Sequence, residues 1–299
     1  MNYLKELVTR GFLVDEEAKD IINNLNEDDF NRLVESLKKD NPLMVSKDYV
    51  KNMFLKEVRI LKEFKKKKKM SIKDYVGILN SKYDILQSIL IEKLELKNVV
   101  SINKCISGPA SVIGMVRTIK DKGINFEVVV EDPTGEIKTG VSKNLGSRIS
   151  LDDVIAISGN MNNKIFFADK IIFPDVPLRP VNYSSDSVKV GFISEKESEV
   201  DYVVSSNQVI DNLKDKIYKI EEPALVELGG IKILVLGDND PLEILKKRYV
   251  KINDTSFVID IVPDIVFSEK DVNKNYKGIT IVSPNNVIDL KTREVNEIL

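Results

Sequence analysis

Five carboxylate residues could bind a metal ion, because each follows a stretch that predicts a buried strand. They are Glu195, Glu197, Asp238, Asp240 and Asp271. Layered α/β folds bind ligands beyond the carboxyl ends of their strands, and hard cations such as Mg²⁺ accept oxygen ligands. Lys196 and Lys270 lie among these carboxylates, and their fixed positive charge disfavours a cation at the same place. We therefore expect solvated loop charges and no bound metal, with a carboxylate-only metal site as the alternative.

The composition excludes other kinds of metal and acid/base chemistry. The chain has no histidine among its 299 residues, and Cys105 is its only cysteine. Histidine-dependent chemistry, an internal disulfide and a cysteine-built zinc site are therefore ruled out. A single cysteine fits a reducing compartment, so we expect a cytoplasmic protein.

The charge of the whole chain says little about partners. The 45 basic and 47 acidic residues leave a net charge of −2, so a nucleic-acid contact would require a local basic patch. No apolar run reaches the roughly 18 residues of a membrane helix, and charges interrupt the apolar residues of the N-terminus. We expect neither a signal peptide nor a membrane partner.

Residues 1–60 predict a helical N-terminal domain. Apolar residues recur at helical spacing in three segments, over 4–8, 18–25 and 30–37. The third segment stops before Asn41-Pro42, because the residue that precedes a proline is pushed out of the helical region. The prediction is a small bundle of about 45 residues, close to the size at which a core is marginal alone.

Residues 61–104 predict a lysine-rich linker followed by a packing helix. The run Lys65 to Lys69 has few apolar neighbours, and blocks of like charge are typical of solvated linkers. The alternative is a nucleic-acid contact without sequence preference. Apolar residues resume at helical spacing from Tyr75 to Leu90, which predicts a helix that packs against the next domain.

Residues 105–180 predict a five-stranded barrel. Five short β-rich runs are separated by turn signals. Asp121-Lys122-Gly123 closes the first hairpin and Asp132-Pro133-Thr134-Gly135 closes the second. With an irregular stretch over 145–150 between the third and fourth strands, this is the plan of an OB-fold β-barrel.

Residues 181–299 predict a short α/β layer domain. Helices are expected over 209–218 and 241–249. Strands are expected over 188–193, 231–236, 257–261 and 279–282. The expected fold class is α+β multidomain, with a helical bundle, an OB-fold β-barrel and an α/β domain in chain order.

A series of motifs runs in a specific order from residue 75 to residue 290. They are Tyr75-Val76, Ser81-Lys82-Tyr83, Leu86 to Leu90, Val112-Ile113-Gly114-Met115-Val116, Glu131-Asp132-Pro133-Thr134-Gly135, Asp152-Asp153-Val154-Ile155, Pro174-Asp175-Val176-Pro177, Leu245-Lys246-Lys247-Arg248-Tyr249, Val258-Ile259-Asp260-Ile261-Val262-Pro263-Asp264-Ile265, Tyr276-Lys277-Gly278 and Val287-Ile288-Asp289-Leu290. This order resembles the small subunit of archaeal D-family DNA polymerase, a family related to the B-subunits of eukaryotic replicative polymerases. The resemblance spans most of the chain.

The resemblance implies that residues 181–299 form a truncated, degenerate calcineurin-like phosphoesterase domain. Active members look like 3'-5' exonucleases that hold two metals on Asp, His and Asn ligands, where paired cations activate water and stabilise the leaving oxygen. The family's first motif, Phe-Ile-Ser-Asp-x-His, is matched here by residues 192–197, with Glu in place of Asp and of His. The late Gly-His-x-His motif is matched by residues 268–271, and the middle His-Gly motif by residues 236–237. The degenerate positions are Glu195, Glu197, Gly237, Glu269 and Asp271.

The function that this resemblance implies is architectural. We expect no catalytic residue, no metal, no cofactor and no exonuclease activity in this chain. We expect a non-catalytic accessory or scaffold subunit in archaeal DNA replication, which docks the large catalytic subunit of D-family DNA polymerase and meets DNA through that complex. An exonuclease with substituted metal ligands is the least favoured interpretation.

The alternative function is a free-standing OB-fold protein that binds single-stranded nucleic acid. Such barrels need exposed aromatic side chains beside a basic groove. The barrel aromatics are Phe126, Phe166, Phe167 and Phe173, and their neighbours place most of them in the core. The candidate groove residues are Lys120, Lys122, Lys138, Lys143 and Arg148.

Overall fold

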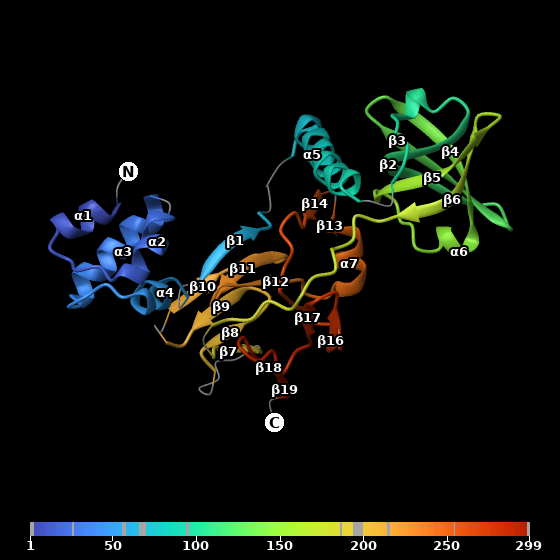
Figure 1. Cartoon of the computed structure of the whole chain (residues 1–299). Coiled ribbons are helices and arrows are strands. Elements are labelled where there is room, and N and C mark those ends of the chain that lie inside the picture. Colours follow the sequence, from blue (N-terminus) through green and yellow to red (C-terminus); the bar gives the residue numbers. More distant parts are fainter. Residues whose placement is uncertain are drawn as a thin grey trace.

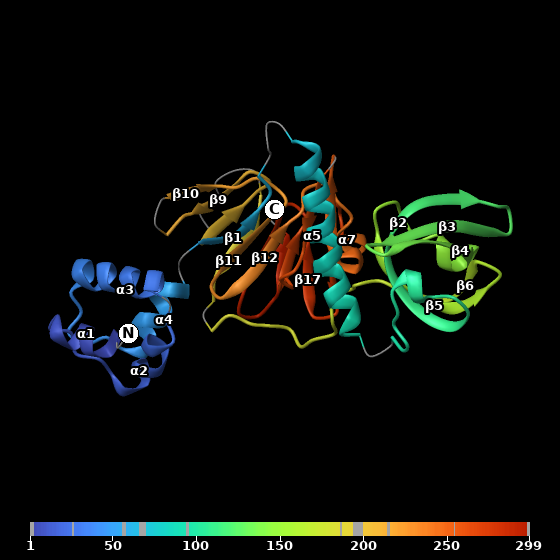
Figure 2. The ribbon, with the colours of Figure 1, turned by 90° about the horizontal axis from the view of Figure 1, so that it is seen from above.

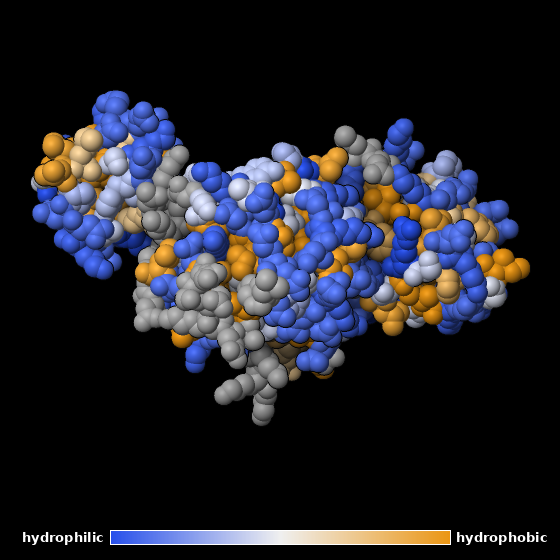
Figure 3. Space-filling model, turned by 90° about the horizontal axis from the view of Figure 1, so that it is seen from below, coloured by the Kyte–Doolittle hydropathy of each residue, from blue (hydrophilic) through white to orange (hydrophobic). Residues whose placement is uncertain are grey.

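The chain folds into a helical bundle, a β-sandwich and a β-barrel, which lie in a row (Figures 1 and 2). This computed structural model describes residues 3–25, 27–55, 58–65, 70–93, 96–185, 187–193, 200–213, 216–253 and 255–297. The predicted mixture of helices and strands is confirmed. In the space-filling view of Figure 3, hydrophilic residues are spread over all three parts, with hydrophobic areas at the outer end of the bundle, on the sandwich and on the barrel.

The helical bundle contains the three predicted helices and one more. Its elements are α1 (Tyr3–Thr9), α2 (Glu16–Asn23), α3 (Glu27–Asp40) and α4 (Lys47–Leu55). Leu7, Ile22, Phe30 and Leu33 pack in a core of their own. Helix α3 ends where expected, because Asn41 takes a positive φ of 43° and Pro42 follows it.

The sandwich consists of two facing six-stranded sheets. The first has the strand order β1 (Arg59–Glu63), β11 (Ala224–Leu228), β12 (Ile231–Val235), β15 (Ile265–Phe267), β17 (Ile279–Val282), β16 (Lys274–Tyr276). The second has the order β10 (Lys216–Lys219), β9 (Gln208–Asp211), β8 (Tyr202–Val204), β7 (Lys189–Phe192), β18 (Asn286–Asp289), β19 (Val295–Glu297). Strands β12, β15 and β17 run parallel, as do β7 and β8.

Strand β12 shows why its sequence is apolar at nearly every position. Ile233 and Val235 face the core between the two sheets. Leu234 and Leu236 face a second core on the opposite side of the first sheet. Because neighbouring side chains of a strand point to opposite faces, a strand that is covered on both faces needs apolar residues throughout.

The predicted helix over 209–218 is wrong. These residues contribute to strands β9 and β10, which pair with each other in antiparallel register. Val209 faces the core of the sandwich, whereas its neighbour Ile210 packs on the outer face of the same sheet. This alternation has the period of a strand, and β-branched residues suit it.

The segment expected to begin the linker contains strand β1. Residues 59–63 pair with β11 and extend the first sheet by one strand, so the expected boundary at residue 60 falls inside a strand. Val58 belongs to the core of the sandwich. Of the lysine run, Lys65 is described, and residues 66–69 lie outside the described residues.

The predicted five-stranded barrel is confirmed. It closes in the order β2 (Gly108–Asp121), β3 (Asn125–Asp132), β4 (Gly135–Ser142), β6 (Ile165–Ile172), β5 (Val154–Asn162). Both predicted turns join the strands expected of them. The short helix α6 (Lys143–Gly146) occupies the irregular stretch before β5, and a 3-10 turn (Ile102–Lys104) precedes β2.

Helix α5 (Ile72–Ile91) joins the barrel to the sandwich, as the prediction of a packing helix requires. It begins with a capping box formed by Ser71 and Asp74. Leu86 and Leu90 pack against the barrel and against the hairpin of β13 (Tyr249–Ile252) and β14 (Thr255–Val258), which follows helix α7 (Pro241–Lys247). Within the described ranges, no helix is both long and apolar enough to cross a membrane.

Candidate functional site

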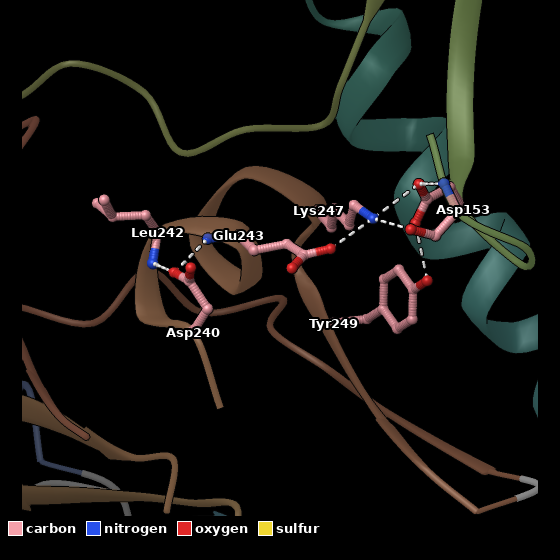
Figure 4. Close-up of polar contacts among 7 residues, drawn as sticks. Asp153, Asp240, Leu242, Glu243, Lys247 and Tyr249 are labelled. Carbon is pink, nitrogen blue, oxygen red and sulfur yellow. Dashed lines mark hydrogen bonds and ion pairs between the residues drawn. The ribbon is translucent and has the colours of Figure 1, made fainter. Parts of the chain in front are cut away.

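A buried ionic cluster joins the barrel to the sandwich (Figure 4). The Asp153 side chain, at the start of β5, is 1% exposed, and Lys247, the last residue of α7, is 8% exposed. Their charged atoms, Oδ2 and Nζ, lie 3.0 Å apart. The hydroxyl of Tyr249 donates to the other oxygen of Asp153 at 2.8 Å. A barrel residue is thus bound by two residues of the sandwich.

Further contacts satisfy the remaining atoms of this cluster. The backbone N–H of Ser150 donates to Asp153 at 2.7 Å, and Lys247 donates to the Ser150 hydroxyl at 2.7 Å. The Glu243 carboxylate lies 2.7 Å from Lys247. Burial raises the pKa of Asp153, and the positive charge of Lys247 opposes that shift. Because the Asp153 carboxylate is buried and bound by several partners, we interpret it as a contact that positions the barrel on the sandwich and not as a group that exchanges protons with solvent.

Lys82 brings helix α5 into the same joint. Its ammonium donates to the Asp152 carbonyl at 2.7 Å and lies 3.3 Å from the centroid of the Tyr249 ring. Burial lowers the pKa of Lys82 to about 8, although the nearby Asp152 and Asp153 carboxylates oppose the shift. The side chain of Tyr249, in β13, therefore contacts both Lys82 of helix α5 and Asp153, which directly precedes barrel strand β5.

A second contact holds the segment that leaves the barrel. Asp175 accepts hydrogen bonds from the Tyr276 hydroxyl at 2.9 Å and from Lys277 at 2.6 Å. Gly278 is required there, because a Cβ would lie 2.2 Å from the Arg179 carbonyl oxygen and φ is +85°. All these residues except Arg179 belong to the motifs that carried the sequence resemblance.

Three segments aligned with the degenerate metal positions begin at one end of the sandwich. Phe192, the last residue of β7, stacks on Phe267, the last residue of β15, with ring centroids 4.9 Å apart. Gly237 follows β12, and its carbonyl accepts the backbone N–H of Glu269 at 2.8 Å. Glu195 and Glu197 lie outside the described residues. The structure thus brings Gly237 and Glu269 together at the end where β7 also finishes.

Glu222 lies in this group and was missed by the sequence analysis. Gly237 has a φ of +57°, and a Cβ there would lie 2.5 Å from a carboxylate oxygen of Glu222. Ser206 donates to Glu269 at 2.7 Å. Burial and the charge of Glu269 raise the pKa of Glu222. Its only sequence signal was a carboxylate next to Pro223 at the start of a strand, which is not specific.

The other candidate metal ligands have different partners. Asp238 pairs with Lys270 at 2.6 Å. Asp240 caps α7 by accepting from the backbone N–H groups of Leu242 and Glu243 (Figure 4). Asp271 is exposed. Within the described ranges no three Asp, Glu, His or Cys side chains gather to hold a metal ion.

The predicted basic residues of the barrel are all exposed, but they do not form one groove. Lys143 pairs with Asp121 at 3.1 Å, and Lys122 lies 3.9 Å from Glu127. Lys120 stands opposite Glu127 in the β2–β3 register. Lys138 and Arg148 make no ion pair with a described residue, and Arg148 alone of the predicted set lines the large cleft described next.

A cleft of about 630 Å³ lies between the barrel and helix α7. Six basic and three acidic side chains line it. The basic residues are Lys93, Arg148, Lys170, Lys246, Lys247 and Lys277, and the acidic residues are Asp175, Asp240 and Glu243. The surplus of positive charge is local, because the whole chain carries a net charge of −2.

These features define a mixed α/β chain in which buried polar contacts hold a closed barrel against a two-sheet sandwich.

The chain resembles the DNA polymerase II small subunits of three archaea. It is 31% identical to that of Pyrococcus abyssi over 46% of this chain, 29% identical to that of Methanothermobacter thermautotrophicus over 42%, and 26% identical to that of Archaeoglobus fulgidus over 42%. The matches cover only 25–27% of these relatives' own lengths. No family model matches the chain.

Two solved structures show a local likeness to part of the chain. An OBody bound to hen egg-white lysozyme is 17% identical, with 26% of this chain and 95% of that chain covered and a TM-score of 0.24. Asparaginyl-tRNA synthetase from Pyrococcus horikoshii, complexed with asparaginyl-adenylate, is 15% identical, with 24% and 21% covered and a TM-score of 0.22.

Proposed function

We propose that this chain is a non-catalytic accessory subunit of an archaeal replicative DNA polymerase. Its role is to present the barrel and the sandwich to the large catalytic subunit as one body. The observation that carries the proposal is the buried joint, in which Asp153 is bound by Lys247 and Tyr249. All three residues lie in the motifs on which the sequence resemblance rests, so those motifs include residues whose contacts hold two domains together.

The proposal includes an OB-fold barrel and a degenerate phosphoesterase-like sandwich. The strand order of the closed barrel, with the fifth strand inserted between the third and fourth, supports the first part. For the second part, the position of the family's middle histidine holds Leu236, a buried core residue, and Gly237 packs against a carboxylate. Exonuclease activity by this chain is therefore not part of the proposed function.

The proposed setting is the cytoplasm of an archaeon, and DNA is met mainly through the polymerase complex. The names of the three relatives support a polymerase partner. Strands β16 and β19 each form one edge of a sheet, and an edge strand is able to pair with an additional polypeptide.

Co-purification tests this function. The full chain, carrying an affinity tag, is expected to capture the large polymerase subunit of its host in a stoichiometric complex that survives gel filtration. Loss of capture on deletion of residues 188–299 would place the interface on the sandwich. A full chain that elutes alone in the presence of the large subunit would contradict the accessory function.

The alternative function, a free-standing binder of single strands, predicts the opposite pattern. Such a protein would bind strands tightly and ignore the large subunit. A manganese-dependent loss of 3' nucleotides that disappears in Glu195→Ala would instead restore the exonuclease interpretation.

A further inference from the structure

The cleft between the barrel and α7 holds cations that no carboxylate of the described ranges neutralises. Arg148, on the barrel, and Lys246, on α7, both line the cleft and are both exposed. Neither side chain forms an ion pair with another described residue. Lys170 of β6 lines the same cleft from the barrel side. A cleft whose walls carry a surplus of one sign of charge concentrates ions of the opposite sign.

The buried joint fixes the two walls of this cleft against each other. Lys247 donates to the Ser150 hydroxyl at 2.7 Å and pairs with Asp153 at 3.0 Å, which holds the last turn of α7 against the segment that precedes β5. Lys246 directly precedes Lys247 in the sequence, and Arg148 lies two positions before Ser150. The two unpaired cations therefore lie on facing walls, next to a contact that already sets the spacing of those walls.

The carboxylates of the cleft have partners within the protein. Glu243 lies 2.7 Å from Lys247 along α7 (Figure 4). Asp240 accepts from two backbone N–H groups at the start of α7, and Asp175 accepts from a lysine and a tyrosine. Six basic and three acidic residues line the cleft, and buried Asp153 adds a fourth acid because it shares Lys247. A surplus of two positive charges is left for a ligand.

The size of the cleft and its surroundings favour a compact anion over an extended one. Its volume of about 630 Å³ lies within the range of roughly 300–1,000 Å³ that is typical of small-molecule sites. Phe173 and Leu242 contribute apolar lining, and an apolar wall strengthens contacts between charges. Elsewhere on the barrel, Lys122 and Lys143 stand beside carboxylates, so an extended polyanion would meet negative charge there.

We infer that this cleft binds a compact anion with two or three linked phosphate groups, such as inorganic triphosphate or the triphosphate of a nucleotide. The planar guanidinium of Arg148 offers paired donors to one phosphate. Lys246 and Lys170 bring point charges to the next phosphate. A chain of phosphates uses cations of both walls at once, whereas a single phosphate makes fewer of these contacts. The inference goes beyond the accessory function, because docking a catalytic subunit requires no small anion.

Isothermal titration calorimetry of the full chain alone with inorganic triphosphate, in magnesium-free buffer at low salt, tests the inference. Saturable binding is expected, and Arg148→Ala with Lys246→Ala should weaken it about ten-fold or more, since both unpaired cations are removed. Inorganic phosphate should bind about ten-fold more weakly than triphosphate. Titration with dTTP distinguishes the two sources: equal affinity means that the phosphates alone are recognised, higher affinity means that the nucleoside also occupies the cleft, and both results agree with the inference.

The matched control is Lys216→Ala with Lys219→Ala, which removes two exposed positive charges from β10 on the sandwich. It is expected to bind triphosphate as the native chain does, and circular dichroism verifies the fold of each variant. The inference would be overturned by unchanged affinity in the cleft variant or by equal affinity for phosphate and triphosphate. Displacement of triphosphate by oligo-dT or polyglutamate at an equal concentration of charge would also overturn it. Since the large polymerase subunit is absent from this experiment, its result is independent of the co-purification test.

Discussion

At the scale of single residues, one end of the sandwich holds two carboxylates, Glu222 and Glu269, that form no ion pair with another residue of the described ranges. Glu222 and Glu269 are close enough for the charge of one to raise the pKa of the other. Ser206 donates to Glu269, and Gly237 leaves space for the Glu222 carboxylate. Two neighbouring carboxylates repel each other, and the repulsion increases as the pH rises because both become ionised.

Glu222→Gln is expected to stabilise the fold at neutral pH by about 0.5 kcal/mol, a size typical of exposed charge pairs. The pKa of Glu222 is raised above 4.5 in the folded state, so the unfolded carboxylate ionises first. The stability that protonated Glu222 contributes is full below about pH 4.5 and is lost as pH rises through the folded pKa. Urea denaturation at pH 4 and pH 7 should show the gain only at pH 7. Glu227→Gln, in β11 opposite Arg59 and Lys232, is the control, and a gain of equal size there would contradict this explanation.

At the scale of elements, the joint between the barrel and the sandwich depends on a few polar side chains within an apolar contact. Helix α5 supplies the apolar part through Leu86 and Leu90. Asp153, Lys247 and Tyr249 fix the orientation of the barrel relative to the sandwich. Their hydrogen bonds are directional, so they form only when the two domains lie in one relative position. A buried ion pair contributes little net free energy to folding. Removing only one of its partners nevertheless destabilises the fold strongly, because the other charge stays buried without a countercharge.

Lys247→Met is therefore expected to destabilise the chain by about 3 kcal/mol, since Asp153 would be left buried without its countercharge. Limited proteolysis should then cut between the barrel and the sandwich sooner than in the native chain. Lys246→Met is the matched control, because that side chain is exposed and should change stability by less than about 0.5 kcal/mol. Adding Asp153→Asn to Lys247→Met should recover part of the loss. Equal melting temperatures for Lys247→Met and Lys246→Met would show that the buried ion pair does not stabilise the joint.

At the scale of the whole molecule, strand β1 ties the segment after the helical bundle into the sandwich. It pairs with β11, and Lys62 donates to the Val258 carbonyl at 2.8 Å and pairs with Asp260 at 2.7 Å. Val58, just before the strand, is 5% exposed and lies in the sandwich core. The helical bundle has a separate core, with no residue shared.

A chain that begins at residue 57 should therefore retain the melting temperature of the sandwich, whereas one that begins at residue 66 should lose stability. The second truncation removes Val58, whose burial alone contributes roughly 1.5–3 kcal/mol, and exposes the edge of β11. Differential scanning calorimetry of the two truncations measures the difference. Identical transitions would mean that β1 adds nothing to the sheet.

The sequence by itself determined the features that depend on local order. The barrel strands and both hairpin turns followed from alternating apolar residues and from Asp-Lys-Gly and Asp-Pro-Thr-Gly, because turn chemistry and strand period act between neighbours. Three helices of the bundle, α5 and α7 followed from helical spacing. The absence of histidine likewise excluded a class of chemistry wherever the residues came to lie.

Only the tertiary structure decided which distant residues meet. Residues 209–218 have a helical length and apolar content, but two buried faces of a sheet make Val209 and Ile210 strand residues. Nothing local to Glu222 indicated that it would lie against Gly237. Asp153 and Lys247 are 94 positions apart, and their pairing depends on how α5 seats the barrel on the hairpin of β13 and β14. Period and turn signals carry no information about such contacts, since these arise when separate apolar faces are buried together.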